Sequence, residues 1–594
     1  MKRLLLLGLL VACGGKAVFR LSSDENNSYA LRETLAKRQL PARPMPVNDA
    51  HQPRVFAVVG GPQKAIVAFD LAAGSALWTA PADVQSRIAV GGDFIVALEG
   101  AQLVGRDQAR GGVRWRSAVP GTFVGVAADR ERAYVVYKDG SRSWLAGLSG
   151  RSGDRLWKAD AAGQLGAPAA HGGVVYVPFL QQWLAIVDGA RGTQLTRIRG
   201  LDEQIAMVRV TSQRAYYGSK AGVFALDERS ASGRRADATY GTIAIPPQLE
   251  RTSYGADAYD PVQQTYSAAD RARILWTSPA ATSTALQFDG CAIHYFRFVF
   301  GCDPVGGIRW AYSHPRVELV ASAHTGAVIA AVSAAGDVVA LDPRNGYLLA
   351  TQSLGTRGPV IGATFDADGW SPRSTGVNPL LTNEALVSIL HDHDARFDRV
   401  KELAASALAK LPGAEVTKEL LAVLADDRAP ARLKDTVAGL LVVRRDPASL
   451  PVLVQQLAVH DDYLAQTKAE ALGPTARAIG GLAGEKLDRG QVAAAVAALQ
   501  AHLDAPTTPV ADLAQVIEAL VAIGGGGERQ ALGSHLLLYH ADDELGGDPV
   551  WQKAIVGALA HSGAGERVLL RHVAADPRTR PTLAATIRDT LGAE

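Results

Sequence analysis

The stretch Ile66–Trp78, IVAFDLAAGSALW, decides the fold, because it joins an apolar strand, a turn and an aromatic residue in a unit that recurs along the chain. Within it, Asp70, Gly74 and Trp78 are spaced four apart. An Asp side chain accepts hydrogen bonds from backbone N–H groups two residues on, and Gly takes the positive-φ position of a turn. The indole of Trp is a large apolar plate, suited to fill the space between neighbouring sheets.

The unit returns with a period near 40 residues. Successive copies carry Asp107, Gly111 and Trp115; Ser149, Gly153 and Trp157; Asp188, Gly192 and Thr196; Asp227 and Arg235; Trp276; Trp310; and Asp342, Gly346 and Ala350. Intervals between the Trp-equivalent positions run from 34 to 42 residues. Such a period of strand–turn–strand units is typical of a β-propeller. The eight anchor positions predict an all-β propeller of eight blades over residues 54–370, with seven blades as the alternative.

The Asp-x-x-x-Gly-x-x-x-Trp turn resembles the repeat of the pyrroloquinoline-quinone-type propeller family, over roughly residues 50–375. That family contains cofactor-dependent dehydrogenases and non-enzymatic relatives, among them the propeller lipoprotein of the outer-membrane β-barrel assembly machinery. Its dehydrogenases hold quinone and Ca²⁺ on the propeller axis, many beneath a ring formed by adjacent cysteines. This chain has no adjacent cysteine pair, and its blades are too short for the loops of such a site. We therefore expect no cofactor.

Composition excludes several other functions. The chain has 594 residues, of which 48% are hydrophobic and 20% charged, as in ordinary globular proteins. A net charge of +2 gives no electrostatic case for nucleic acid. The motifs of serine hydrolases, P-loop enzymes, zinc proteases and dithiol oxidoreductases are missing. We expect no catalytic residue, no metal site and no small-molecule substrate.

Two acidic fragments merit comparison with metal sites. Asp366–Gly369 begins like a Ca²⁺ loop, but its twelfth position is Val377, which offers no carboxylate. His391 and His393 are two residues apart, so on a helix they point to different faces. A turn and a solvated helix end are the preferred interpretations.

Residues 1–12 are interpreted as a signal peptide. Lys2 and Arg3 precede the apolar run Leu4–Val11, which is shorter than the roughly 20 residues that span a bilayer. Its end, Leu-Val-Ala-Cys13, resembles the bacterial lipobox. The resemblance implies a diacylglycerol on the Cys13 thiol, cleavage before it, and acylation of the new amino terminus. Gly14, in place of the Asp that retains enterobacterial lipoproteins at the inner membrane, implies the outer membrane.

The remaining boundaries follow from changes of pattern. Residues 13–53 are polar and proline-rich and are expected to form a flexible tether carrying the lipidated Cys13. Residues 371–377 form a linker, after which apolar residues recur with a period of 3.6 over residues 378–594. Ala407, Gly439, Ala519 and Ala558 align at offsets of 32, 80 and 39. This resembles HEAT repeats, which implies an all-α solenoid of five or six helix pairs.

Two further groups of residues are singled out inside the propeller. Cys291 and Cys302 bound an apolar segment that can fold back as a hairpin, and in an oxidising compartment they would form a disulfide; two buried thiols are the alternative. Tyrosines gather in the irregular segment 237–273, where they either contact a partner or pack a degenerate blade: Tyr240, Tyr254, Tyr259 and Tyr266.

These features predict a non-enzymatic scaffold that is anchored in the outer membrane by lipid, faces the periplasm and binds other envelope proteins, in a role in outer-membrane protein assembly. Cell-surface exposure is the alternative location. The alternative functions are a surface adhesion or motility component and a relative of quinone-dependent dehydrogenases.

Overall fold

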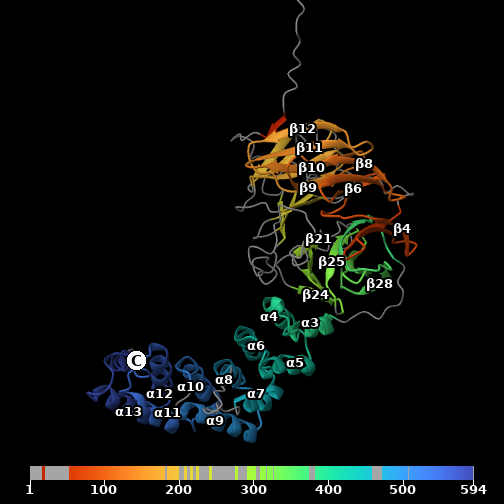
Figure 1. Ribbon diagram of the computed structural model, residues 1–594. Coiled ribbons are helices and arrows are strands. Elements are labelled where there is room, and N and C mark those ends of the chain that lie inside the picture. Colours follow the sequence, from red (N-terminus) through yellow and green to blue (C-terminus); the bar gives the residue numbers. More distant parts are fainter. Residues whose placement is uncertain are drawn as a thin grey trace, which may run out of the picture. The chain divides into compact units, whose positions relative to one another are not determined.

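The computed structural model divides into two compact units, Met1–Ala385 and Leu386–Glu594 (Figure 1). It describes residues 17–19, 52–180, 183–199, 207–210, 215–218, 223–226, 240–243, 274–277, 291–302, 308–315, 317–325, 327–372, 382–457, 471–505 and 508–592.

The described part of the first unit forms seven sheets, each with four antiparallel strands. These four strands are successive in the chain except in the first sheet, where the ring closes, and the third sheet gains a fifth, parallel strand. The first sheet joins β2 (Arg54–Val59), β3 (Ala65–Asp70) and β4 (Ser75–Pro81) to β29 (Val360–Asp366). The second holds β5 (Ala89–Val90), β6 (Phe94–Glu99), β7 (Gln102–Asp107) and β8 (Val113–Ala118). The third holds β9 (Thr122–Ala128), β10 (Arg132–Asp139), β11 (Arg142–Ser149) and β12 (Arg155–Ala161).

Four more sheets follow along the chain. The fourth holds β13 (Ala169–His171), β14 (Val174–Phe179), β15 (Trp183–Asp188) and β16 (Gln194–Arg199). The fifth holds β17 (Met207–Val210), β18 (Ala215–Gly218), β19 (Val223–Leu226) and β20 (Tyr240–Ile243). The sixth holds β21 (Ile274–Thr277), β22 (Cys291–Tyr295), β23 (Phe298–Cys302) and β24 (Ile308–Ser313); the seventh holds β25 (Leu319–His324), β26 (Ile329–Ser333), β27 (Asp337–Leu341) and β28 (Leu348–Ser353).

The sheets succeed one another as the blades of a propeller do. Their first strands contact in the order β21, β25, β29, β5, β9, β13, β17. The middle strands are almost wholly buried, as in β2 and β3, whereas the outermost strand β4 is largely exposed. The core therefore lies between the faces of adjacent sheets, for instance around Phe94, Trp115 and Tyr137.

The prediction of eight blades is not confirmed: the described residues form seven sheets. Trp276, counted as the anchor of a separate blade, lies in β21, the first strand of the sixth sheet. The true anchor of that sheet is Trp310 in its last strand. Trp276 is not preceded by the Asp and Gly of the turn motif. This absence is the local signal that distinguishes it from a Trp in the last strand of a sheet.

The tether prediction needs a correction within residues 13–53. Ala17–Phe19 form a short strand, β1, which pairs in parallel with β12 and makes the third sheet five-stranded. Backbone pairing of this kind was not signalled by the sequence, because a three-residue strand has no measurable periodicity.

The second unit consists of helices. α3 (Thr382–Leu390) begins just before its boundary and is followed by α4 (Asp398–Leu408), α5 (Ala414–Ala425), α6 (Ala431–Arg444), α7 (Leu450–Leu457) and α8 (Leu472–Gly481). Then come α9 (Arg489–Asp504), α10 (Val510–Gly524), α11 (Arg529–Tyr539), α12 (Pro549–Ala560), α13 (Ala564–Ala575) and α14 (Pro581–Gly592). None of the described helices has the length and hydropathy required to span a bilayer.

The helices form two layers. In one, α4, α6, α8, α10, α12 and α14 contact in succession; in the other, α5, α7, α9, α11 and α13 do so. The four small residues aligned from the sequence, Ala407, Gly439, Ala519 and Ala558, all fall in the first layer. Small side chains there allow close approach: Gly480 of α8 lies against the backbone of Ala519. The specific resemblance to HEAT repeats stays a prediction.

Polar side chains buried between the layers are paired. Trp551 of α12 donates its indole N–H to Nε2 of His535 on α11, at 3.3 Å. The ring of Tyr539 lies 4.8 Å from that of His535. Burial lowers the pKa of His535 to about 4, against the opposing charge of Asp504.

We predict that this histidine makes the helical unit sensitive to acid. In the unfolded chain the pKa of His is about 6.5, so between that pH and about 4 the unfolded state binds the extra proton. Stability therefore falls as pH drops through this window, by up to about 1.4 kcal/mol per unit. His535→Gln keeps an acceptor for Trp551 but does not titrate. Hydrogen exchange of α11 and α12 at neutral and mildly acidic pH should show less acid-induced loss of protection in His535→Gln; equal losses in both chains would contradict the assignment.

Candidate functional site

The repeated turn is built by one residue at the end of each third strand. At Asp70, Oδ1 accepts hydrogen bonds from the backbone N–H groups of Ala72 (2.8 Å) and Ala73 (2.9 Å). Gly74 donates its N–H to the Asp70 carbonyl at 2.8 Å and has φ +68°. A residue with a Cβ is strained at this φ, so the Gly of the motif is a backbone requirement.

The other copies share this geometry. The backbone N–H of the Gly bonds to the carbonyl of the residue four before it in Asp107–Gly111, Ser149–Gly153, Asp188–Gly192 and Asp342–Gly346. The φ values of these glycines are +74°, +76°, +70° and +72°. Ser149 substitutes for Asp because its Oγ accepts from Ser152 N at 3.3 Å.

Nearby arginines keep two of the Asp side chains charged. Burial alone would raise the pKa of Asp107, but hydrogen bonds from Arg114 and from the turn's backbone hold it below its ordinary value. The same balance lowers the pKa of Asp342, where Arg344 supplies both kinds of hydrogen bond. The turns at Asp107 and Asp342 therefore carry an anionic acceptor at neutral pH.

Each Trp of the motif joins its own sheet to the next one. Trp115 lies opposite Gly105 in the strand pairing, and a Cβ on Gly105 would overlap its indole. Its Nε1 donates to the carbonyl of Gly150, in the turn of the third sheet, at 2.9 Å. A Cβ on Gly153 of that turn would lie 2.6 Å from the ring. The indole is thus held between two glycines from different sheets.

The same lock recurs around the ring. Nε1 of Trp78 donates to Gln108 O at 3.0 Å, that of Trp157 to Gly189 O at 2.9 Å, and that of Trp310 to Pro343 O at 3.0 Å. Each acceptor directly follows the first residue of the next turn. The turn glycines Gly111, Gly192 and Gly346 face the respective rings. The fourth sheet, which has Thr196, lacks an indole at this position.

At the ring closure a different residue makes the equivalent bond. Ala350 occupies the Trp-equivalent position of the seventh sheet, but Gln352, two residues on, donates its amide N–H to Leu71 O at 2.9 Å. Leu71 directly follows Asp70, so the acceptor position is the same as in the Trp locks. No sequence signal marks this role, because the Gln lies outside the motif's spacing.

Sequence reasoning also missed a buried ion pair. Arg106 forms two hydrogen bonds with the Glu99 carboxylate, at 2.6 and 2.7 Å, and donates to Gly111 O and Pro81 O at 3.0 and 3.1 Å. Because every charged atom has a protein partner, the pair ties the second sheet to the first and is structural.

Cys291 and Cys302 are direct partners across the β22–β23 hairpin. Opposite residues in antiparallel strands have Cα atoms about 4.5–5.5 Å apart, within the range that a disulfide bridges. The hairpin predicted from the sequence is therefore present, and the disulfide stays a prediction. Of the four tyrosines, Tyr240 opens β20 opposite Leu226; Tyr254, Tyr259 and Tyr266 lie outside the described residues, as does Cys13.

Among the residues that the structure describes, no three or more His, Cys, Asp or Glu side chains gather as metal ligands. The absence of a metal site at the two acidic fragments stays a prediction. Asp366 ends β29 and accepts from Gln108 Nε2 at 2.9 Å, and Gly369 has φ +79° in the turn that follows. His391 pairs with Glu419 of α5 at 2.8 Å.

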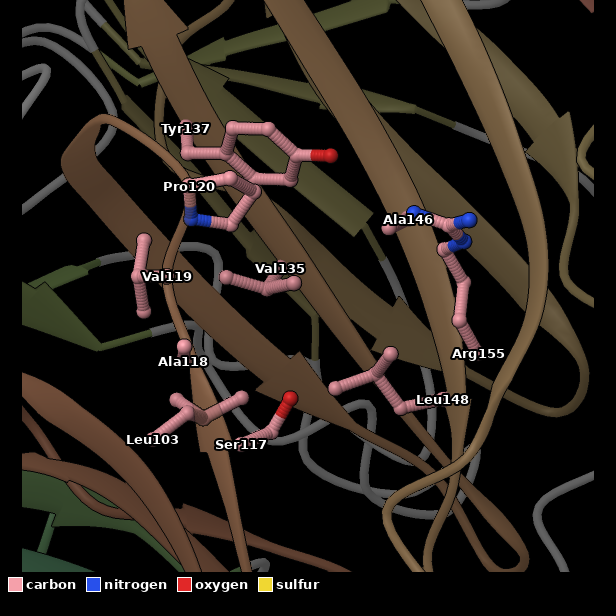
Figure 2. A pocket seen from close by; sticks show the side chains of 10 residues that line it. All are labelled: Leu103, Ser117, Ala118, Val119, Pro120, Val135, Tyr137, Ala146, Leu148 and Arg155. Atoms are coloured by element: carbon pink, nitrogen blue, oxygen red, sulfur yellow. The ribbon is translucent and has the colours of Figure 1, made fainter.

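A hollow of about 100 Å³ opens between the second and third sheets (Figure 2). Leu103, Val119, Val135 and Leu148 give it an apolar floor, while Tyr137 and Arg155 bring a hydroxyl and a guanidinium to its edge. Burial raises the pKa of Tyr137, although Arg155 opposes the shift. Pockets for drug-sized ligands measure about 300–1,000 Å³, so this hollow can take one amino-acid side chain but no quinone cofactor.

The helical unit exposes aliphatic side chains instead of a hollow. Val443 of α6 is 79% exposed, Leu538 of α11 is 71% exposed and Val568 of α13 is 61% exposed. α11 and α13 are neighbours in one layer. A Cβ added to Gly533 of α11 would lie 3.0 Å from the side chain of Leu569 on α13. Their exposed apolar side chains thus belong to adjoining helices.

Comparison with known proteins finds one family whose model matches part of the propeller. Residues 63–234 match the family described as "Outer membrane protein assembly factor BamB". The match runs from β3 to beyond β19 and so includes the locks of Trp78, Trp115 and Trp157. Curated proteins yield no significant match to the chain.

Solved structures give fold-level similarity only. BamB from Moraxella catarrhalis is 17% identical, with 52% of this chain and 84% of that chain covered and a TM-score of 0.33. AztD from Citrobacter koseri is 10% identical, with 54% and 100% covered and a TM-score of 0.33. Sqt1 from Saccharomyces cerevisiae is 11% identical, with 53% and 88% covered and a TM-score of 0.34. Scores this low support no functional argument.

We predict that Gly153→Ala destabilises the propeller much more than Gly140→Ala. Both glycines have positive φ, +76° and +57°, so both variants acquire backbone strain of about 1 kcal/mol. Only at Gly153 does the new methyl meet an indole; a methyl at Gly140 would have no heavy atom within 4 Å apart from its own residue and the two chain neighbours. The extra cost should be about 1–3 kcal/mol, measured by denaturant unfolding of the full chain. Equal destabilisation would show that the Trp115 contact is unimportant.

Proposed function

We propose that this chain is a non-enzymatic, lipid-anchored scaffold of the outer membrane that faces the periplasm, binds other envelope proteins and serves the assembly of outer-membrane proteins. The observation that carries the proposal is the match of residues 63–234 to the BamB family. The match includes three of the four Trp locks, those of Trp78, Trp115 and Trp157.

The geometry of the propeller supports binding more than catalysis. Its repeated Asp residues bond to their own turns, and the buried Arg106–Glu99 pair is fully satisfied within the protein. The hollow at Tyr137 has room for a side chain rather than a cofactor. Such a surface is suited to hold a protein segment.

The two compact units support a bridging form of the proposal. Each unit has its own core, and each has its own exposed apolar side chains: Val113 and Tyr347 on the sheets, Leu538 and Val568 on the helices. The propeller would contact the assembly machinery, and the helical unit would bind a second envelope protein. A scaffold with two independent surfaces brings two partners to one place.

The proposed lipid anchor can be tested by replacing Cys13 and, as a control, another of the chain's three cysteines. We predict that Cys13→Ser abolishes incorporation of a labelled fatty acid and releases the protein from the membrane fraction. Cys291→Ser is the matched control, because that thiol belongs to a strand pair and should not affect acylation. Retention of label in Cys13→Ser would contradict the anchor.

The bridging function is testable by photocrosslinking in cells. With a photoreactive residue at Val113 of the propeller, we expect adducts to outer-membrane barrel-assembly components; at Leu538 of α11, adducts to a different envelope protein. The side chains are 43% and 71% exposed, so neither replacement disturbs the core. A photoreactive residue at Val443, on the other helix layer, controls for non-specific capture. Adducts only to soluble enzymes, or identical adducts at all positions, would overturn the proposal.

A further inference from the structure

The short strand β1 covers the outer edge of the third sheet. β12 is the outermost strand of the third sheet, and such a strand presents unpaired N–H and C=O groups. β1 pairs with it in the register Ala17–Ala159, Val18–Asp160 and Phe19–Ala161. β1 also contacts β16, the outermost strand of the fourth sheet. Figure 1 shows it as the short red arrow beside β12.

This pairing fixes the position of Ala17 and so limits how far away Cys13 can lie. Ala17 follows Cys13 by four residues. Because an extended chain spans at most about 3.6 Å per residue, the Cα of Cys13 lies within about 14 Å of that of Ala17. Acyl chains on Cys13 would therefore emerge beside the outer rim of the third and fourth sheets and not at the end of a long tether.

The pairing between β1 and β12 is weak by itself, so a second attachment is needed to hold β1 in place. Each backbone hydrogen bond contributes about 1 kcal/mol net, whereas ordering a residue costs about 1–2 kcal/mol. For three residues the cost of ordering therefore equals or exceeds the gain from hydrogen bonds. An acyl anchor in the bilayer, a few residues away, raises the effective concentration of the segment at the rim, so that the two attachments support each other.

The side chains on this rim suit a lipid surface. Arg155 on β12 is exposed, and Leu156 beside it is 52% exposed. The ammonium group of Lys158 lies 4.5 Å from the centre of the Trp144 ring and 3.6 Å from Oδ1 of Asp160. Cationic and aliphatic groups of this kind favour the interface of an anionic bilayer, although Asp160 offsets part of the charge.

We infer that the outer rim of the third sheet, with β1 docked on it, is the surface by which the propeller lies against the membrane. The inference rests on the proposed lipid anchor at Cys13. It means that the ring stands on its rim, with its axis along the membrane plane. Both faces of the ring then stay open to partner proteins.

Docking of β1 is tested first, with crosslinking of cysteine pairs by a short bismaleimide in the full-length membrane-bound chain, in which Cys291 and Cys302 are replaced by Ala. Val18→Cys with Asp160→Cys should crosslink efficiently, because these are register partners. Val18→Cys with Thr79→Cys is the matched control, since Thr79 lies on β4, the outermost strand of the first sheet. Equal yields for the two pairs would overturn the inference.

Orientation is tested next with a fluorophore and a nitroxide quencher on the lipid headgroups. A fluorophore on Leu156→Cys should be quenched several-fold more than one on Thr79→Cys. Insertion of about 20 Gly and Ser residues between Lys16 and Ala17, a flexible spacer, should reduce the difference. Equal quenching in a chain that still carries labelled fatty acid would overturn the orientation and leave the anchor intact. Absence of the label would instead mark failure of the anchor.

Discussion

The contact of a tryptophan indole between two glycines of adjacent sheets is the interaction on which the propeller depends. At Trp115, one glycine lies in the same sheet and the other in the turn of the next, and both positions exclude a Cβ. The indole N–H then bonds a carbonyl of that turn. The turn itself exists only because Asp or Ser accepts its backbone N–H groups and Gly takes positive φ. The hydrogen bonds that form each turn therefore also position the glycine and the carbonyl against which the indole of the neighbouring sheet packs.

The ring need not repeat this lock everywhere, because backbone pairing and buried polar bonds can replace it. Gln352 makes the hydrogen bond of the missing Trp at the closure, and β29 completes the first sheet by pairing with β2. Thr364 of β29 also donates to Ile88 O at 2.8 Å, which joins the closing strand to the second sheet. Closure thus rests on several moderate contacts from the last strands of the chain.

These constraints leave the rims and faces of the ring as the variable surfaces. On the rim, the edge of β12 is covered by β1, while the hollow at Tyr137 lies between the second and third sheets. The helical unit adds its own exposed aliphatic side chains on α6, α11 and α13. If the proposed membrane contact and partner contacts use these surfaces, they lie on different elements and can be occupied together.

The sequence by itself determined the turn, the blade and the order of sheets before helices, because Asp, Gly and Trp at fixed spacing and the change to a period of 3.6 are local signals. It also anticipated the hairpin of Cys291 and Cys302. It misjudged Trp276, since an aromatic residue at the right interval looks the same in the first strand of a sheet as in the last. Only the tertiary structure decided the number of sheets described, the role of Gln352, the Arg106–Glu99 pair and the docking of β1. Gln352 and β1 bond to residues far away in the chain, and the Arg106–Glu99 pair is completed by Pro81 O of the neighbouring sheet. Such contacts depend on which strands become neighbours, which no local pattern encodes.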